Sequence, residues 1–339
     1  MTRGGLLALI VLIAAGCGGG GGGVDSAAVP SATVAPPPAP QPPPQPPPAP
    51  AMPTSATRGF AAGTPWASYY GAAAAVDLAQ LARTFRVIDI DADPATGNFT
   101  AAQITQLKNG GANKVLSYFN LGACEHFRDY WRTAPTGVLS CSANLTAQRG
   151  PYQGYADETW MNPGDPAYQQ LLLDVVAPRL VAQGVDGFYF DNLEIVEHGS
   201  ATGNGPCDAA CSQGGLDLVA RLRAKYPQLL FVMQNATSDI TRSGVTGGVA
   251  FASLLDGVAH EEVYAPVYDA TVESQLVSWA GLNLRPGGQP FWIATLDYVG
   301  TCTNLAGASA AYQRSRARGF VPYASDASAR QGTVCYWGL

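Results

Sequence analysis

Residues 184–192 read Gly-Val-Asp-Gly-Phe-Tyr-Phe-Asp-Asn, and this stretch decides the fold prediction. The run from Gly187 to Phe190 has the length and composition of a short buried β-strand, and Asp191 and Asn192 follow at its carboxyl end. In a (β/α)8 barrel the functional groups lie at the carboxyl ends of the strands, because the loops that line the site begin there. The stretch therefore predicts a barrel strand that delivers a carboxylate to a site.

Seven more strand patterns alternate with helical patterns along the chain. With the quoted strand at 186–191, we predict strands at 66–70, 86–91, 114–120, 229–235, 255–261, 290–298 and 320–325. We predict helices at 76–83, 100–108, 166–183, 216–225, 238–250, 273–280 and 306–318. The helix at 238–250 has the weakest pattern because it contains several glycines. Eight alternating units predict an α/β fold, a closed (β/α)8 TIM barrel over residues 59–339.

The first residues resemble a bacterial export signal. Arg3 precedes an apolar run at 6–15 that is too short to span a bilayer, and Ala14-Ala15-Gly16-Cys17 resembles a lipobox. We expect residues 1–16 to be a lipoprotein signal peptide and Cys17 to be lipidated. The alternative is an ordinary secretory signal with a chance cysteine. The expected location is the bacterial cell envelope, at the outer membrane or cell surface, with the lipid as the contact to the membrane.

Residues 17–58 are rich in glycine and proline. Gly18–Gly23 is an unbroken glycine run, and 13 of the 26 prolines lie between Pro30 and Pro53. Such a segment cannot bury a core, so we predict a disordered, extended tether that holds the folded domain away from the membrane. Its alternative use is as a ligand for proline-recognition domains.

Six cysteines remain once Cys17 is assigned to the lipid. An even number in an exported protein predicts disulfides. Pairing sequence neighbours gives Cys124–Cys141, Cys207–Cys211 and Cys302–Cys335, a preference among about 15 possible pairings. A zinc site is disfavoured because the Cys207–Cys211 pair has no second ligand pair nearby, and we expect no metal.

The formal charge of −6 and the pI near 5.0 argue against a nucleic-acid partner and suit a cationic or neutral ligand. The sequence has neither a Gly-x-Gly-x-x-Gly phosphate-binding motif nor a Gly-x-Ser-x-Gly elbow. We therefore expect no cofactor. The expectation for the assembly is a monomer.

Polar residues end most of the predicted strands, and charged groups in a barrel interior are costly unless they are used. Asp191 and Glu261 are the best-placed carboxyl pair, because strands two apart face the same cleft. Hydrolysis of a glycosidic bond commonly needs one protonated and one ionised carboxyl group. Glu262 is an alternative to Glu261, since a slip of one residue along the strand reverses which of them points inward.

Further polar and aromatic residues at strand ends are candidates for substrate binding. They are Asp89, Asp91, Tyr118, Asn120, Glu158, Trp160, Asn192, Asn235, Tyr264, Asp297 and Tyr298. The His260-Glu261-Glu262 stretch lacks the second histidine of a zinc-protease helix, so it predicts no metal site.

Four segments resemble glycoside hydrolase family 114, the endo-α-1,4-polygalactosaminidase-like barrels. Val87-Ile-Asp-Ile-Asp91 looks like the second-strand aspartate motif, and Tyr118 to Asp129 is similar to the third-strand pattern of Tyr, Gly, Glu and Arg. The Asp157 to Asn162 segment resembles the family's Glu-x-Trp-Leu-Asp, and residues 184–192 resemble its signature strand. The order of the four segments makes the resemblance specific.

The resemblance implies a glycoside hydrolase with Asp191 as nucleophile or base and Glu261 as general acid. It also implies an α-1,4-linked galactosamine polymer as substrate, a cationic polysaccharide that suits an acidic protein. Phe190, Asn162 and Glu194 depart from the family pattern, which leaves the exact sugar open. Two alternatives remain, a non-catalytic polysaccharide-binding surface lipoprotein on the same barrel and an interaction scaffold.

Overall fold

A computed structural model describes residues 59–284 and 291–339. The predicted signal peptide (1–16), the lipidated Cys17 and the tether (17–58) lie outside the described residues. They therefore remain predictions.

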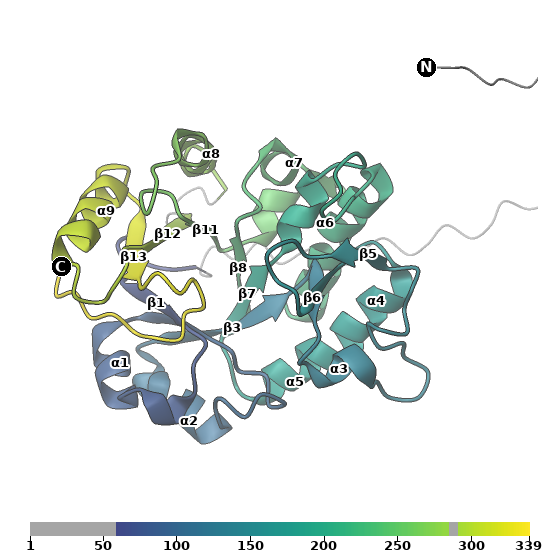
Figure 1. Cartoon of the computed structure of the whole chain (residues 1–339), viewed down its shortest axis with the longest axis horizontal. Coiled ribbons are helices and arrows are strands. Elements are labelled where there is room, and N and C mark those ends of the chain that lie inside the picture. Colours follow the sequence, from purple (N-terminus) through teal and green to yellow (C-terminus); the bar gives the residue numbers. More distant parts are fainter. Residues whose placement is uncertain (1–58, 285–290) are drawn as a thin grey trace, which may run out of the picture. The chain divides into compact units, whose positions relative to one another are not determined.

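Eight parallel strands form the barrel, and the predicted fold class is confirmed. Figure 1 shows the strands at the centre with helices around them. The sheet order is β1-β2-β3-β7-β8-β11-β12-β13, and the indole of Trp66 on β1 donates a hydrogen bond of 3.0 Å to the Val321 carbonyl on β13, so the two edges meet. The strands are β1 (Trp66–Tyr69), β2 (Val87–Ile90), β3 (Lys114–Asn120), β7 (Gly187–Asp191), β8 (Leu230–Gln234), β11 (Gly257–Glu261), β12 (Trp292–Tyr298) and β13 (Val321–Ser325). Each corresponds to one predicted strand.

The strands are buried on both faces, because side chains alternate between the barrel interior and the surrounding helices. In β7, Tyr189 packs in the interior with Trp66, while Phe188 and Phe190 pack outward with the helices. This alternation places every second residue of a strand toward the interior. It later decides which strand-end side chains reach the site.

The helices lie between the strands. Asp77 caps α1, and Thr100 with Gln103 forms a capping box at α2. The predicted helix at 166–183 is divided by a π-helical turn at 172–176, just before Pro178, whose nitrogen has no hydrogen to donate. The helices are α1 (Leu78–Thr84), α2 (Ala101–Leu107), α3 (Asp129–Arg132), α4 (Pro166–Leu171), α5 (Ala177–Ala182), α6 (Ala209–Lys225), α7 (Asp239–Arg242), α8 (Ala270–Ala280) and α9 (Leu305–Ala317). Short 3-10 turns lie at Ala73–Ala75, Asn109–Gly111, Leu193–Glu197 and Phe251–Leu254.

Two regions differ from the prediction. The predicted helix at 238–250 is wrong, because only α7 is helical and a short hairpin of β9 (Val245–Thr246) and β10 (Val249–Ala250) follows it. Gly247 and Gly248 form the hairpin turn with φ values of 57° and 80°, a conformation that glycine adopts without strain. The helix α6 starts seven residues before its predicted start, at the Asp208 cap.

An insertion between β3 and β7, residues 121–165, was not predicted to contain strands. It forms a separate antiparallel sheet with the order β4-β6-β5, from β4 (Ala123–Glu125), β5 (Gln148–Pro151) and β6 (Glu158–Met161). The insertion begins at the carboxyl end of β3 and leads back to the barrel through α4, and Figure 1 shows its strands β5 and β6 beside β3 and β7.

Three disulfides join the six cysteines of the described residues in the predicted pairs. Cys124–Cys141 lies within the insertion, and Cys207–Cys211 lies at the start of α6. Cys302–Cys335 ties the C-terminal segment, residues 326–339, to the loop after β12. No helix in the described ranges is long and apolar enough to cross a membrane.

Candidate active site

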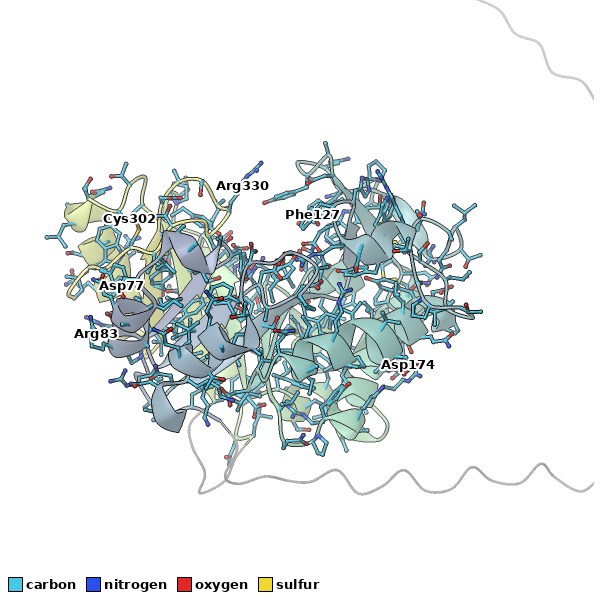
Figure 2. The ribbon with its side chains drawn as sticks, turned by 90° about the horizontal axis from the view of Figure 1, so that it is seen from below. Asp77, Arg83, Phe127, Asp174, Cys302 and Arg330 are labelled. Atoms are coloured by element: carbon cyan, nitrogen blue, oxygen red, sulfur yellow. A yellow bond between two sulfur atoms is a disulfide. The ribbon has the colours of Figure 1, made fainter. Side chains whose placement is uncertain are left out.

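A cleft of about 500 Å³ opens at the carboxyl ends of the barrel strands. Strand-end residues form its base, the insertion forms one wall, and the C-terminal segment forms part of the other wall. Figure 2 shows Phe127 of the insertion and Arg330 of the C-terminal segment on opposite sides of its opening. This position, at the strand ends, is where a (β/α)8 barrel carries its active site.

Asp191 and Glu261 both line the cleft, and one amide bridges them. Gln234 Nε2, at the end of β8 between β7 and β11, donates to Asp191 Oδ1 and to Glu261 Oε2, each over 3.0 Å. The Tyr189 hydroxyl donates to Gln234 Oε1 over 2.6 Å, which fixes the amide orientation. Because both distances end on one nitrogen, the two carboxylate oxygens lie no more than 6.0 Å apart.

Glu261 accepts hydrogen bonds from four side chains. Oε2 accepts from Gln234 Nε2 and, over 2.9 Å, from Asn235 Nδ2. Oε1 accepts from the Tyr298 hydroxyl and, over 3.0 Å, from Gln331 Nε2. Asn235 Oδ1 accepts from the Glu261 backbone N–H over 3.1 Å. This contact fixes the orientation of the Asn235 side-chain amide, so that its NH2 group is the one that faces the Glu261 carboxylate. Four donors favour the ionised form of Glu261.

Burial opposes that ionisation. Loss of hydration raises the pKa of Glu261, and the hydrogen bonds from Tyr298 and Asn235 work against this rise. Burial, and secondly the Glu261 charge, raise the pKa of Asp191 to about 7. Two neighbouring carboxylates cannot both ionise without cost, so the pair binds one proton near neutral pH.

The chain turns sharply just after each of the three site strands. Asn192, Asn235 and Glu262 follow Asp191, Gln234 and Glu261, and their φ values are 58°, 63° and 55°. Asparagine tolerates this left-handed conformation better than most residues, while a glutamate adopts it at a cost. The turns end the strands immediately behind the functional side chains.

Alternation along the strands decides between Glu261 and Glu262. Ala259 packs in the barrel interior and Val258 packs outward, so Glu261 points inward and lines the cleft. Glu262 lines a separate pocket beside it. The structure therefore places Glu261, as predicted, in the same cleft as Asp191.

The insertion side of the cleft carries charge. Glu158 accepts a hydrogen bond of 3.3 Å from Asn192 Nδ2, and burial, then the charge of Glu125, raises the pKa of Glu158 to about 8. Arg128 is buried, and it donates to Glu125 Oε2 over 2.9 Å and to Asp91 Oδ1 over 3.0 Å. Burial raises the pKa of Asp91, and Arg128 opposes this rise.

Carboxyl groups outnumber cations in the cleft. Arg128 and Arg330 are its two cationic side chains, and Arg128 already pairs with lining carboxylates. The lining carboxyl groups are Asp91, Glu125, Asp157, Glu158, Asp191 and Glu261. The excess of negative charge suits a cationic ligand.

Six of the predicted substrate-binding residues lie elsewhere than on the cleft surface. Asp91, Tyr118, Glu158, Asn192 and Asn235 line the cleft, and Tyr298 reaches it through its hydrogen bond to Glu261. The six residues that do not line the cleft are Asp89, Asn120, Trp160, Tyr264, Asp297 and Tyr298.

Burial explains these positions. Asp297 is fully buried on the outward face of β12 and accepts the backbone N–H groups of Tyr264 and Ala265, so it holds a loop in place. Tyr264 is buried, and its hydroxyl donates to Glu273 over 3.1 Å. Trp160 is buried, and its indole donates to Asn204 over 2.7 Å.

Asp89 and Asn120 lie just behind the cleft surface. Asp89 is fully buried and accepts from the hydroxyls of Ser68 and Tyr70 on Oδ2, while its Oδ1 has no hydrogen-bond partner in the structure as described. Burial raises its pKa well above the usual range. Asn120 donates to the Tyr118 hydroxyl over 3.2 Å, so it supports a lining residue.

The sequence reasoning missed several lining residues. Gln234 could have been found, because Val232 and Gln234 share the inward face of β8 and Asn235 lies beyond it. No sequence pattern indicated Gln331 as a site residue, since it lies in the C-terminal segment after the last predicted strand. The other polar or aromatic lining residues that were not predicted as site residues are Tyr70, Thr96, Asn98, Glu125, Phe127, Arg128, Tyr152, Tyr155, Asp157 and Arg330.

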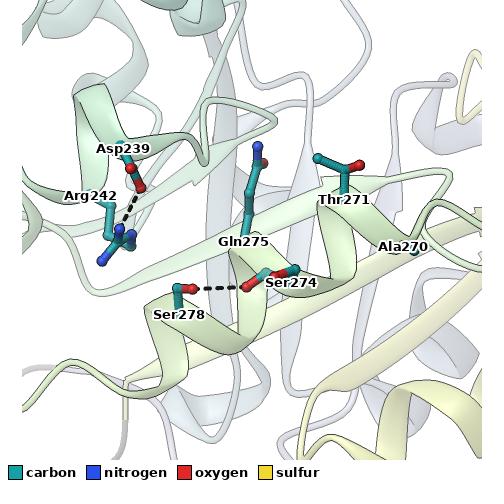
Figure 3. Close-up of a pocket in the computed structure, with 7 residues that line it drawn as sticks. All are labelled: Asp239, Arg242, Ala270, Thr271, Ser274, Gln275 and Ser278. Carbon is teal, nitrogen blue, oxygen red and sulfur yellow. Dashed lines mark hydrogen bonds and ion pairs between the residues drawn. The ribbon is translucent and has the colours of Figure 1, made fainter.

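A separate groove lies between α7 and α8 (Figure 3). Asp239 and Arg242 form an ion pair with each other in it, and Ser278 donates to the Ser274 carbonyl over 2.9 Å. It shares no lining residue with the cleft. In the described ranges, no group of three or more His, Cys, Asp or Glu side chains is placed to hold a metal ion.

Comparison with known proteins agrees with this architecture. The glycoside hydrolase domain of PelA from Pseudomonas aeruginosa is similar with a TM-score of 0.59 and 17% identity, over 80% of this chain and 97% of that one. Ega3 of Aspergillus fumigatus, solved in complex with galactosamine, is similar with a TM-score of 0.58 and 16% identity, over 82% of this chain and 96% of that one. At these identities the likeness shows the fold. No curated protein sequence matches the chain.

The family itself is shown by the sequence. The model of glycoside-hydrolase family GH114 matches residues 46–275, which include the insertion and the strands that carry both carboxyl groups. The chain belongs to glycoside-hydrolase family GH114.

Proposed function

We propose that this protein hydrolyses an α-1,4-linked galactosamine-type polymer with Asp191 and Glu261. The observation that carries the proposal is the bridge through Gln234, which joins the two carboxyl groups across one cleft. The two bridged oxygens are at most 6.0 Å apart. This closeness is compatible with the separation of about 5–5.5 Å between the carboxyl groups of retaining glycosidases. Retention of configuration, which the family resemblance favours, is part of the proposal.

In a retaining reaction one carboxylate attacks the anomeric carbon, and the other carboxyl group protonates the leaving oxygen and then activates water. The family resemblance assigns attack to Asp191 and proton transfer to Glu261. The four donors to Glu261 favour its carboxylate in the free protein, while Asp191 has a pKa of about 7. The assignment thus requires the bound substrate to move the shared proton onto Glu261.

Rescue by azide distinguishes the two assignments. Replacing the nucleophile with alanine leaves room for azide to attack the anomeric carbon from the side where the nucleophile stood. The sugar azide that forms then has the anomeric configuration opposite to that of the substrate. The variant that lacks the acid/base still forms the glycosyl-enzyme from an aryl glycoside whose phenolate leaves without a proton, and azide then attacks this intermediate and gives the original configuration. We expect an inverted azide product from Asp191→Ala and a retained one from Glu261→Ala, and the exchanged result would reverse the two roles.

The charge of the cleft supports an amino sugar. Six carboxyl groups and two guanidinium groups line it, and one guanidinium is already paired. A galactosamine polymer carries one protonated amine per unacetylated sugar, so it would be attracted to this surface. The galactosamine in the Ega3 structure is consistent with this choice among relatives of the same fold.

The test is incubation with partly deacetylated α-1,4-galactosamine polymer and detection of released oligosaccharides by mass spectrometry. Wild-type protein should release oligomers, and Asp191→Asn and Glu261→Gln should not. If both variants cleave as fast as wild type, the carboxyl pair is wrongly assigned. Binding of intact polymer without cleavage would instead indicate the non-catalytic polysaccharide-binding alternative.

We also propose that the protein is exported and anchored through Cys17. Three disulfides between the six remaining cysteines support an oxidising compartment. Expression with a labelled fatty acid should label wild type and leave Cys17→Ser unlabelled. Equal labelling of both would contradict the anchor.

A further inference from the structure

A second pocket, of about 450 Å³, lies beside the catalytic cleft at the ends of β11 and β12. It adjoins the cleft in two places. Ala329 lines both spaces, and Tyr298 lines the second pocket while its hydroxyl donates to Glu261 in the cleft. The second pocket therefore begins next to the carboxyl pair.

Glu262 supplies the charge of this pocket. Its left-handed backbone, with φ of 55°, turns the chain out of β11, so that adjacent glutamates line adjacent spaces. The equivalent turns after β7 and β8 use asparagine, which adopts this conformation more readily. Residues held in a costly conformation often serve function, and here the turn places a carboxylate in the second pocket.

The Glu262 side chain is exposed, and its carboxylate has no hydrogen bond or ion pair within the residues that the structure describes. The other walls are largely apolar or already satisfied. Pro266 and Val299 are apolar, and the amide of Asn304 donates to the Val299 carbonyl over 2.7 Å and accepts from Gly307. One unpaired carboxylate beside apolar walls and a tyrosine ring suits a sugar that carries one cationic group.

We propose that the second pocket is a sugar subsite in which Glu262 binds the protonated amine of a hexosamine unit of the polymer. This inference rests on the proposed function, since it extends the same substrate beyond the cleavage point. A subsite next to the carboxyl pair lengthens the stretch of polymer that the protein grips. The subsite predicts that a longer oligomer binds more tightly only when the sugar that reaches the second pocket carries a protonated amine.

The experiment compares wild type, Glu262→Gln and Glu262→Gly on fully deacetylated α-1,4-galactosamine oligomers of increasing length. Glycine fits the left-handed turn without strain, so its variant should fold at least as well as wild type. We expect both variants to raise KM about fivefold for long oligomers and to leave kcat within about twofold. The short oligomers that cannot fill the subsite, and N-acetylated oligomers of any length, should show no difference.

Asp239→Asn is the matched control, because it removes one exposed negative charge from the groove between α7 and α8 (Figure 3) and should leave KM unchanged. Calorimetry with the same oligomers separates this inference from the proposed function. If wild type binds but does not cleave, the hydrolase proposal fails, and about fivefold weaker binding to both Glu262 variants still supports the subsite. Equal affinity or equal KM in wild type and both variants would overturn the subsite, as would no binding to wild type.

Discussion

The two walls of the cleft differ in chemistry although each is tied by a disulfide. The insertion (121–165) contains Cys124–Cys141 and contributes charged groups, among them Glu158, whose pKa is raised to about 8. The C-terminal segment (326–339) is held by Cys302–Cys335 and contributes no carboxyl group to the cleft lining, but the cation of Arg330 and the neutral amide of Gln331, which donates to Glu261. The difference indicates that one wall attracts the substrate and the other prepares a catalytic carboxyl group.

The bridge between the two carboxyl groups is where the largest effect is expected. Gln234→Met keeps the shape of the side chain but removes the donor to both Asp191 and Glu261. We expect kcat to fall about 100-fold, because loss of a positioned donor at a catalytic centre typically costs this much or more. Steady-state kinetics measures it, and a melting curve close to that of wild type excludes unfolding. A change in KM alone would contradict the positioning role.

The C-terminal segment should affect kcat more than KM. Gln331→Met removes one of four donors to Glu261, while the backbone carbonyl of residue 331 still accepts from the Tyr70 N–H. We expect kcat to fall about tenfold, equivalent to one hydrogen bond to a charged group. The pH optimum should also rise, since loss of a donor raises the pKa of Glu261. A changed KM with an unchanged pH profile would assign this wall to binding instead.

The insertion should affect KM more than kcat. The pKa of Glu158 is about 8, so the free carboxyl group is mostly protonated at pH 6 and about half ionised at pH 8, where part of the polymer amines still carry a charge. Glu158→Gln should raise KM for the deacetylated polymer about threefold at pH 8 and less at pH 6. Kinetics at both pH values checks this difference. An equal rise in KM at both pH values would show that charge is not the cause.

The smallest effect concerns stability. The folded-state pKa of Asp191, about 7, lies above its unfolded value of about 3.9, so folding favours the protonated form. This contribution is fully present below the unfolded pKa and is lost as pH rises through 7. Asp191→Asn should therefore raise Tm by more at pH 8 than at pH 4, by a few degrees. A variant with the same Tm gain at both pH values would contradict the perturbed pKa.

The strands were predictable because each is a short apolar run that ends in a polar residue, as in Gly187–Asp191. The insertion was not, since its strands are only three or four residues long and alternate weakly. The direction in which each strand side chain points could also have been predicted, because side chains alternate between the two faces of a strand. Leu296 and Tyr298 pack inward on β12, so Asp297 had to point outward, where it binds backbone N–H groups.

The contribution of Gln331 could not be predicted in this way. It depends on a turn in which Ala329 and Gln331 adopt φ values of 50° and 48°, and on long-range contacts to Tyr70, just after β1, and to Tyr298 on β12. Local sequence patterns do not encode such contacts. The outcome shows that strand ends reveal the centre of a barrel site, while its walls come from segments with no periodic pattern.

The central claim is that Asp191 and Glu261 act as one catalytic unit on an amino-sugar polymer. The most direct measurement is the hydrolysis rate of partly deacetylated α-1,4-galactosamine polymer by Asp191→Asn, Glu261→Gln and the double variant. Groups that act together are not additive, so we predict that each single change lowers kcat by about 10³-fold and that the double change costs little more. The claim would be contradicted if the fold-decrease in kcat of the double variant equalled the product of the two single decreases. Full activity in either single variant would also contradict it.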